Sequence, residues 1–210
     1  MRIVDVADHS LSSLLLTRVK AYSDLIKLRL SALVTFSAVF GFILGDRGVS
    51  FGWTGFLGLA LGGFLISGAS GAANEIMERD LDKLMKRTQN RPLPLQIISL
   101  QEAYWFTSLV AFSGIFLLWF FTNPLTTWLG ILSMVLYVFA YTPLKRVGPV
   151  AVFVGAIPGA MPPLLGWTAA TGEITYEALI IFGIQFIWQF PHFWAIAWVS
   201  DEDYKRAGFK

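Results

Sequence analysis

The sequence predicts an all-α fold, a polytopic transmembrane helical bundle. Of the 210 residues, 55% are hydrophobic and only 14% are charged, and the mean hydropathy is +0.61. Several apolar stretches reach the length of about 20 residues that a helix needs to cross a hydrocarbon core. A chain in lipid must satisfy its backbone hydrogen bonds internally, and helices do so. The absence of cysteine excludes disulfides, iron–sulfur clusters and thiol chemistry.

Six apolar runs are expected to be spans, within a membrane bundle at residues 28–199. They are residues 28–44, 52–73, 104–121, 125–141, 150–167 and 178–199. Residues 1–27 are expected to be a cytoplasmic N-terminal segment, because their apolar piece LSSLLL is too short for a signal peptide and no cleavage site follows it. Residues 200–210 begin a second acidic cytoplasmic loop, and we expect further spans beyond it.

Basic residues gather on one side of these spans. That side receives Arg2, Arg18, Lys20, Lys27, Arg29, Arg79, Lys83, Lys86, Arg87, Arg91, Lys145, Arg146, Lys205, Arg206 and Lys210. The other side receives Arg47. Because cytoplasmic loops carry the excess of Lys and Arg, we expect a multi-pass protein of the cell inner (cytoplasmic) membrane, with its N-terminus and every charged cluster in the cytoplasm.

The segment NEIMERDLDKLMKRTQNRPLP, residues 74–94, follows the second apolar run with charges of both signs. Asn74, Glu78 and Asp82 recur every four residues, so a helix would place them along one face. Ser67 and Gly71 continue this face upstream, and small residues allow close helix approach inside a bundle. The span is therefore expected to deliver two carboxylates and an amide to the cytoplasmic mouth of the bundle.

These residue types suit a metal bound to phosphate. Two carboxylates one turn apart repel each other unless a cation lies between them. Oxygen ligands of this kind suit Mg²⁺, which commonly also binds substrate phosphates. Arg87 and Arg91 follow, and their fork-shaped donors match phosphate geometry.

A solvated charged face is the alternative interpretation of the same segment. In that interpretation Arg79, Lys83 and Lys86 serve membrane topology, and Glu75 pairs with Arg79 on the helix surface. Such a face does not require the acids to continue a stripe of small residues, and for Asn74, Glu78 and Asp82 we favour the metal site.

The pattern Asn-x3-acid-x3-Asp followed by KRTQNRPLP resembles the first signature of the UbiA-type intramembrane prenyltransferases. Four further stretches narrow the resemblance to the protoheme IX farnesyltransferase (heme O synthase) family: YTPLKR at 141–146, GAIPGAMPPLLGW at 155–167, PHFWAIAW at 191–198 and EDYKRAG at 202–208. The resemblance runs in order from about Asp24 to the end of the chain. Glu78 departs from it, since the family usually has Asp there, and the second acidic signature is represented by Asp203.

The resemblance implies a UbiA-like bundle of nine helices, six of them in this chain, and Mg²⁺-dependent transfer of a farnesyl group from farnesyl diphosphate to a vinyl group of heme B, giving heme O. The implied catalytic metal ligands are Asn74, Glu78, Asp82 and Asp203. The implied substrate-binding residues are Arg29, Arg87, Arg91, Tyr141, Lys145, Arg146 and His192. The implied partners are the two substrates and membrane lipid, with heme A synthase or terminal oxidase assembly proteins as candidates and no nucleic acid.

The fifth and sixth spans contain residues that are unusual for a membrane helix. His192 directly follows Pro191, and polar groups at this depth usually face a cavity. Its imidazole could ligate heme iron or take up a proton, or it could be a packing histidine bonded to a neighbouring carbonyl. The prolines of the fifth span, Pro158, Pro162 and Pro163, predict an irregular, broken helix that lines a cavity. A kinked packing helix, with small residues for close contact, is a compatible interpretation.

Aromatic side chains could wall the cavity that shields an allylic cation from water. The candidates are Trp105, Trp119, Phe120, Phe186, Trp188, Phe193 and Trp194. Aromatic residues are equally expected at lipid-facing and interface positions, so we expect only some of them in a cavity.

Three other functions are compatible with parts of the pattern. A prenyltransferase with a 4-hydroxybenzoate or chlorophyll-type acceptor would share the first signature. A secondary transporter would share the intramembrane polar groups, but it predicts charge at the midplane and internal repeats. A heme-carrying electron-transfer subunit would need paired axial ligands, and His192 is the only histidine in an expected span.

Overall fold

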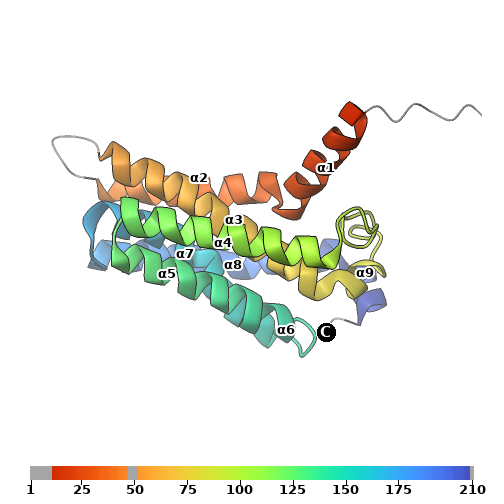
Figure 1. Cartoon of the computed structure of the whole chain (residues 1–210). Helices are drawn as coiled ribbons and strands as arrows, with labels where there is room; N and C mark the ends of the chain where they lie inside the picture. Colours follow the sequence, from red (N-terminus) through yellow and green to blue (C-terminus); the bar gives the residue numbers. More distant parts are fainter. Residues whose placement is uncertain (1–10, 47–51, 209–210) are drawn as a thin grey trace, which may run out of the picture.

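The computed structural model describes residues 11–46 and 52–208, which form a bundle of helices (Figure 1). In chain order they are α1 (Leu11–Leu25), α2 (Leu28–Gly45), α3 (Trp53–Asp82), α4 (Leu100–Phe121), α5 (Pro124–Val135), the π-helical turn η1 (Leu136–Tyr141), α6 (Thr142–Leu144), α7 (Val150–Thr171), α8 (Tyr176–Val199) and α9 (Asp201–Ala207). Three of the basic residues named above, Arg2, Arg47 and Lys210, lie outside the described residues.

Six helices of the described chain are long and apolar enough to cross a membrane, which confirms the six expected spans. They are α2, α3, α4, the continuous run Pro124–Leu144, α7 and α8. The largest difference in length is at α3, which has 30 residues and continues to Asp82 rather than ending near residue 73. The polar residues of the segment 74–82 are therefore part of the same helix as the apolar span.

Side-chain caps mark where several spans begin. Ser99 and Glu102 form a capping box at the start of α4, in which each side chain accepts a hydrogen bond from the other residue's backbone N–H. Asn123 caps α5 and Thr175 caps α8 more simply: the side-chain oxygen of each accepts a hydrogen bond from a backbone N–H in the first turn. These polar residues fix where the apolar helices begin and where the short connections before them end.

Helices α2 and α7 approach closely because glycine lies at their contact. A Cβ on Gly166 would collide with the backbone of Ala38 and Phe42, and one on Gly41 would collide with the backbone of Pro163. In lipid, such small-residue contacts drive helix association through close packing. The same principle applies where α3 meets α4, since a Cβ on Gly62 would lie 3.0 Å from the carbonyl oxygen of Gly114.

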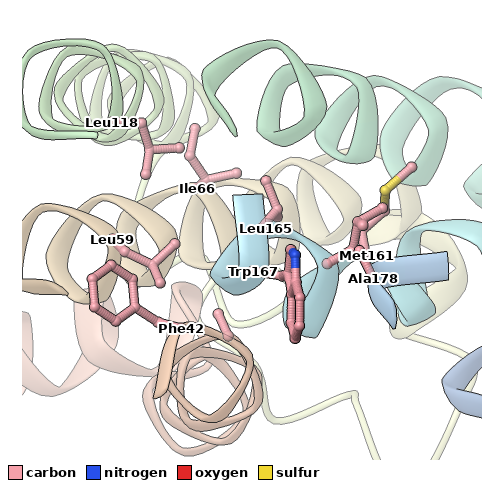
Figure 2. Packing of buried hydrophobic residues seen from close by; sticks show 10 residues of the cluster. Phe42, Leu59, Ile66, Leu118, Met161, Leu165, Trp167 and Ala178 are labelled. Atoms are coloured by element: carbon pink, nitrogen blue, oxygen red, sulfur yellow. The ribbon is translucent and has the colours of Figure 1, made fainter. Parts of the chain in front are cut away.

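The core lies where α2, α3, α4, α7 and α8 meet (Figure 2). Phe42 of α2 packs there with Leu59 and Ile66 of α3, and Trp167 of α7 is buried on the same cluster. The ring of Phe42 meets that of Phe56 edge-on at 5.7 Å between centroids. This core fixes the relative positions of these helices, and charged residues lie at the end of the bundle away from it.

Helix α7 is continuous through its three prolines, so the expected broken fifth span is wrong. Pro163 has no N–H and leaves the carbonyl of Gly159, four residues earlier, without its helical donor. The Gln189 side-chain amide of α8 donates to that carbonyl at 3.3 Å. A neighbouring helix thus supplies the missing donor, as membrane helices with proline require, and Gln189 serves packing.

The irregular backbone lies in the fourth span instead, at the π-helical turn η1. The N–H of Thr142 donates to the carbonyl of Tyr137, five residues back, and the Thr142 hydroxyl donates to the same oxygen at 2.9 Å. Such π turns are rare and occur often at functional sites. Here the turn ends at Tyr141 and comes directly before Thr142 and Lys145, and all three residues reach the candidate site.

The charged segments lie at one end of the bundle, where α1, the α3–α4 connection, α6 and α9 gather in Figure 1. We call this the charged end. The connection, residues 83–99, is compact, because Met85, Thr88, Leu93 and Ile98 in it are buried. Leu93 and Ile98 pack on Leu25 of α1 and on Ile76 of α3 in a second apolar cluster.

Candidate functional site

Asn74, Glu78 and Asp82 form a buried polar stripe on the last two turns of α3. Their relative exposures are 3%, 6% and 0%, although the helix is at the charged end of the bundle. The four-residue spacing brings each side chain about one turn further along the helix. Each of the three is contacted by a basic side chain from a different part of the chain.

Lys145 holds the middle member of the polar stripe. Its Nζ lies 2.6 Å from Glu78 Oε1 and 2.8 Å from Oε2, and the second contact has the geometry of a hydrogen bond. The same ammonium lies 5.1 Å from the ring centroid of Tyr141, close enough for a cation–π contact. Lys145 therefore contacts both Tyr141 and Glu78, two of the predicted site residues.

Arg91 holds the outer member. Its Nη1 donates to Asp82 Oδ2 at 2.8 Å, and its Nε lies 3.9 Å from Glu75 Oε2. The Thr88 hydroxyl donates to the backbone carbonyl of Asp82 at 3.0 Å. The α3–α4 connection thus folds back on the helix that precedes it and inserts a guanidinium between two acids.

Asn74, the inner member, is surrounded by three polar groups. Its amide nitrogen donates to Glu78 Oε2 at 2.9 Å and to the Thr142 hydroxyl at 3.1 Å. Its amide oxygen accepts from Lys27 Nζ at 3.2 Å. Because Thr142 also bonds the π-helical carbonyl of Tyr137, η1 is connected directly to the polar stripe.

Asp203 on α9 is attached to the α3–α4 connection. Its carboxylate accepts hydrogen bonds from the backbone N–H groups of Lys86 and Arg87 at 3.0 and 3.1 Å. Arg206 Nη1 lies 3.7 Å from the same carboxylate. In the described part of the chain, Asp203 therefore approaches the stripe through this connection and contacts backbone rather than Asn74, Glu78 or Asp82.

Burial and local hydrogen bonds shift the pKa of several groups at the charged end. Burial lowers the pKa of Lys27 to about 8, and the positive charge of Arg91 adds to this effect. Burial also lowers the pKa of Lys145, while the charge of Glu78 opposes the change. The backbone N–H groups of Arg87 and Lys86 hold the pKa of Asp203 below its ordinary value.

The donor types in the stripe fit a hard cation such as Mg²⁺. Asn74, Glu78 and Asp82 offer only oxygens, and Mg²⁺ prefers oxygen ligands. Asp82 Oδ1 and Glu75 Oε1 are buried without a hydrogen-bond partner, which is costly unless another group binds them. Within the described ranges, no three acidic, histidine or cysteine side chains are grouped so that they could hold a metal ion. Lys145 and Arg91 instead pair with the carboxylates of Glu78 and Asp82.

The remaining predicted site residues lie outside this cluster. The side chains of Arg29, Arg87, Arg146 and His192 are exposed, so their substrate-binding roles stay predictions. Of the aromatic candidates, Phe193 lies 5.6 Å from the ring of Tyr141, whereas Trp105, Trp119, Phe120, Trp188 and Trp194 are exposed. Arg79 and Lys83 pair with the exposed Asp80, as expected for a solvated face.

Three residues of the cluster were not anticipated from the sequence. Glu75 was considered a surface partner of Arg79, but it is 1% exposed and lies near Arg91. Lys27 was counted only as a topology signal, and Thr142 was not considered. No sequence pattern marks Glu75, because its burial depends on the α3–α4 connection that packs over its side of the helix.

Comparisons with known proteins agree with this fold. The profile of the UbiA prenyltransferase family matches residues 34–210. Over 90% of this chain and 67% of theirs, two structures of a UbiA homologue from Archaeoglobus fulgidus superpose with TM-scores of 0.71 and 0.72, at 20% sequence identity. One of these structures is bound to DMAPP and Mg²⁺ and the other to GPP and Mg²⁺.

Two curated relatives are named protoheme IX farnesyltransferase. The chain is 49% identical over 91% of its length to the protoheme IX farnesyltransferase of Cytophaga hutchinsonii and 42% identical over 87% of its length to the mitochondrial human protein of that name. It spans 66% of the length of the first relative and 41% of the second. The family profile covers most of the chain, and the structural likeness agrees with it: this multi-pass membrane protein belongs to the UbiA prenyltransferase family.

Proposed function

We propose that this protein transfers a farnesyl group from farnesyl diphosphate to a vinyl group of heme B, giving heme O. The observation that carries the proposal is the convergence of Lys27, Lys145 and Arg91 on one buried polar stripe. A diphosphate carries several negative charges and needs fixed cationic donors where that charge develops. The names of the curated relatives support heme as the acceptor.

The basic residues at the stripe and the residues of the stripe itself have different proposed roles. Lys145 and Arg91 would bind diphosphate oxygens, since ammonium and guanidinium groups form strong hydrogen bonds with phosphate. Asn74, Glu78 and Asp82, with Asp203 from α9, would hold Mg²⁺. The charge that Mg²⁺ supplies when bound offsets the negative charge on the leaving diphosphate. The Mg²⁺ in the Archaeoglobus structures supports this requirement in the family.

The position of the stripe suits a substrate with a charged head and an apolar chain. The diphosphate would lie at the charged end, and the farnesyl chain would extend along the apolar interior. Tyr141 and Phe193, whose rings are 5.6 Å apart, would shield the allylic carbon from water and tolerate its positive charge. We propose that the charged end faces the cytoplasm in the inner membrane, as the distribution of Lys and Arg favours.

Incubation with heme B, farnesyl diphosphate and Mg²⁺ followed by mass spectrometry of the heme tests this function. The expected product has the mass of heme O, and Asp82→Asn should reduce its formation at least about a hundredfold, the scale of losing one group that stabilises transition-state charge. Asp80→Asn is the matched control, because the Asp80 side chain is exposed and pairs with Arg79 and Lys83. Unaltered heme, together with prenylation of an aromatic acceptor in a parallel incubation that contains one, would assign a different substrate.

A further inference from the structure

Lys27 lies at a sharp elbow between α1 and α2. Its backbone is left-handed, with φ 50° and ψ 54°, a conformation that residues other than glycine seldom adopt. The elbow is nevertheless well bonded, because the Lys27 N–H donates to the Asp24 carbonyl and the Ser31 N–H donates to the Lys27 carbonyl, both at 3.0 Å. Backbone strain of this kind persists where the surroundings enforce it, and it concentrates at functional sites.

The elbow is fitted against α3 at two small residues. A Cβ on Gly68 would lie 3.1 Å from the Cβ of Ile26, and one on Gly71 would lie 3.4 Å from Cδ of Lys27. The aliphatic stem of Lys27 therefore crosses α3 at Gly71, one turn before Asn74. A Cβ at Gly71 would be in van der Waals contact with this stem, and a side chain that extends further would displace the stem from the helix.

Contacts with the start of α4 hold α1 in place. Arg18 Nη1 donates to the Ile97 carbonyl at 2.9 Å, and Arg18 Nη2 lies 2.7 Å from Glu102 Oε1. The rings of Tyr22 and Phe106 pack at 4.6 Å between centroids. The direction in which Lys27 points is thus set by two neighbouring helices, not by a flexible chain end.

The ammonium group of Lys27 differs from the other cations of the cluster in its partner. Lys145 and Arg91 each bind a carboxylate, whereas the one side-chain hydrogen bond of Lys27 among the described residues is to the neutral oxygen of Asn74. An ammonium has three N–H donors. Lys27 can therefore donate hydrogen bonds to further oxygen atoms without giving up an ion pair.

The depth of Lys27 indicates which oxygens these are. Asn74 is the innermost member of the polar stripe, and successive members are about 6 Å apart along the helix. In a prenyl diphosphate bound along the stripe, the phosphate attached to the hydrocarbon chain lies innermost. We propose that Lys27 binds this prenyl-linked phosphate and completes a row of three basic side chains along α3; the assignment rests on the proposed function.

Binding of inorganic pyrophosphate with Mg²⁺, measured by calorimetry on the protein in lipid nanodiscs at fixed salt, tests the assignment. Lys27→Met keeps the aliphatic stem and should weaken binding at least about tenfold, the scale of one charge-assisted hydrogen bond. Lys27→Arg should recover part of this loss. Lys20→Met, an exposed lysine of α1, is the matched control and should bind within twofold of the unmodified protein.

Lys27→Gly separates binding from folding. Glycine adopts the left-handed conformation without strain, so this variant should unfold at the same temperature as the unmodified protein or higher, yet bind pyrophosphate as weakly as Lys27→Met. Binding within twofold of the unmodified protein in both variants would overturn the role of Lys27 alone. Absence of pyrophosphate and farnesyl diphosphate binding in the unmodified protein would overturn both this role and the proposed function.

Discussion

The Lys145 ammonium lies 2.6 and 2.8 Å from the two carboxylate oxygens of Glu78, with side-chain exposures of 18% and 8%. A charge pair this far from water is costly to break, because the remaining partner stays buried and unpaired. Lys145→Met should therefore lower the free energy of unfolding by roughly 3 kcal/mol, measured by thermal or denaturant unfolding without substrate.

The double variant Lys145→Met with Glu78→Gln provides the comparison. Removing both charges leaves no unpaired ion, so its loss of stability should be clearly smaller than that of Lys145→Met alone. Equal losses in the single and double variants would show that the pair is not the source of the effect.

The glycine contact between α2 and α7 predicts a packing defect. A Cβ on Gly166 would collide with the backbone of Ala38 and Phe42, so Gly166→Ala should cost about 2–3 kcal/mol of stability, at the upper end for an overpacked core. Gly63→Ala in α3 is the control, because nothing lies within 4 Å of a Cβ at that position. It should be neutral or stabilising by up to about 1 kcal/mol.

The attachment of α9 should depend on pH through Asp203. Its folded-state pKa is lowered by the backbone N–H groups of Arg87 and Lys86, so the contact stabilises the attachment above the unfolded pKa of about 3.9 and is lost as pH falls through the folded pKa. Asp203→Asn should reproduce the loss at neutral pH, measured as faster hydrogen exchange of the amides of residues 86 and 87.

Asp201→Asn is the matched control on the same helix. Asp201 is exposed and pairs only with Lys205 in the described part of the chain, so exchange at residues 86 and 87 should not change. Unaltered protection in Asp203→Asn would mean that other contacts hold α9.

His192 should affect heme binding more than diphosphate binding. Its imidazole is exposed on α8 beside Phe193, with 6.0 Å between the ring centroids, and imidazole is a common axial ligand of heme iron. His192→Ala should weaken heme binding roughly tenfold, an energy of about 1.4 kcal/mol, in a titration followed by the Soret band. Ile184→Ala, also exposed on α8, is the control, and an unchanged titration of His192→Ala would remove the ligand role.

The six spans and the polar stripe could be predicted because each depends on residues that are close together in the sequence. Length and hydropathy identify a membrane helix, and the four-residue spacing places Asn74, Glu78 and Asp82 on one face. Glu75 falls outside that spacing by about 100°, and it is buried only because the α3–α4 connection packs over its side of the helix. Composition does not encode this long-range packing.

The expected irregular backbone was assigned to the wrong span for a related reason. Proline predicts a lost hydrogen bond, but it does not predict that Gln189 from another helix will replace the missing donor. The π-helical turn before Thr142 has no comparable residue signature, since it consists of a shift in hydrogen-bond register. Lys27 was overlooked because its left-handed backbone depends on the fit of α1 and α2 against Gly68 and Gly71.

The π-helical turn also determines the geometry of the candidate site without contributing to membrane insertion. It holds one residue more than an α-helix uses to close the same ring of hydrogen bonds. If this turn became an ordinary α-helix with the same number of residues, everything after it would turn by about 100°, swinging the Lys145 side chain away from its carboxylate. Such a chain would keep its hydrophobicity and its span length. It would be expressed, sorted and inserted normally while lacking a working centre, so a screen for correct insertion alone would score it as intact.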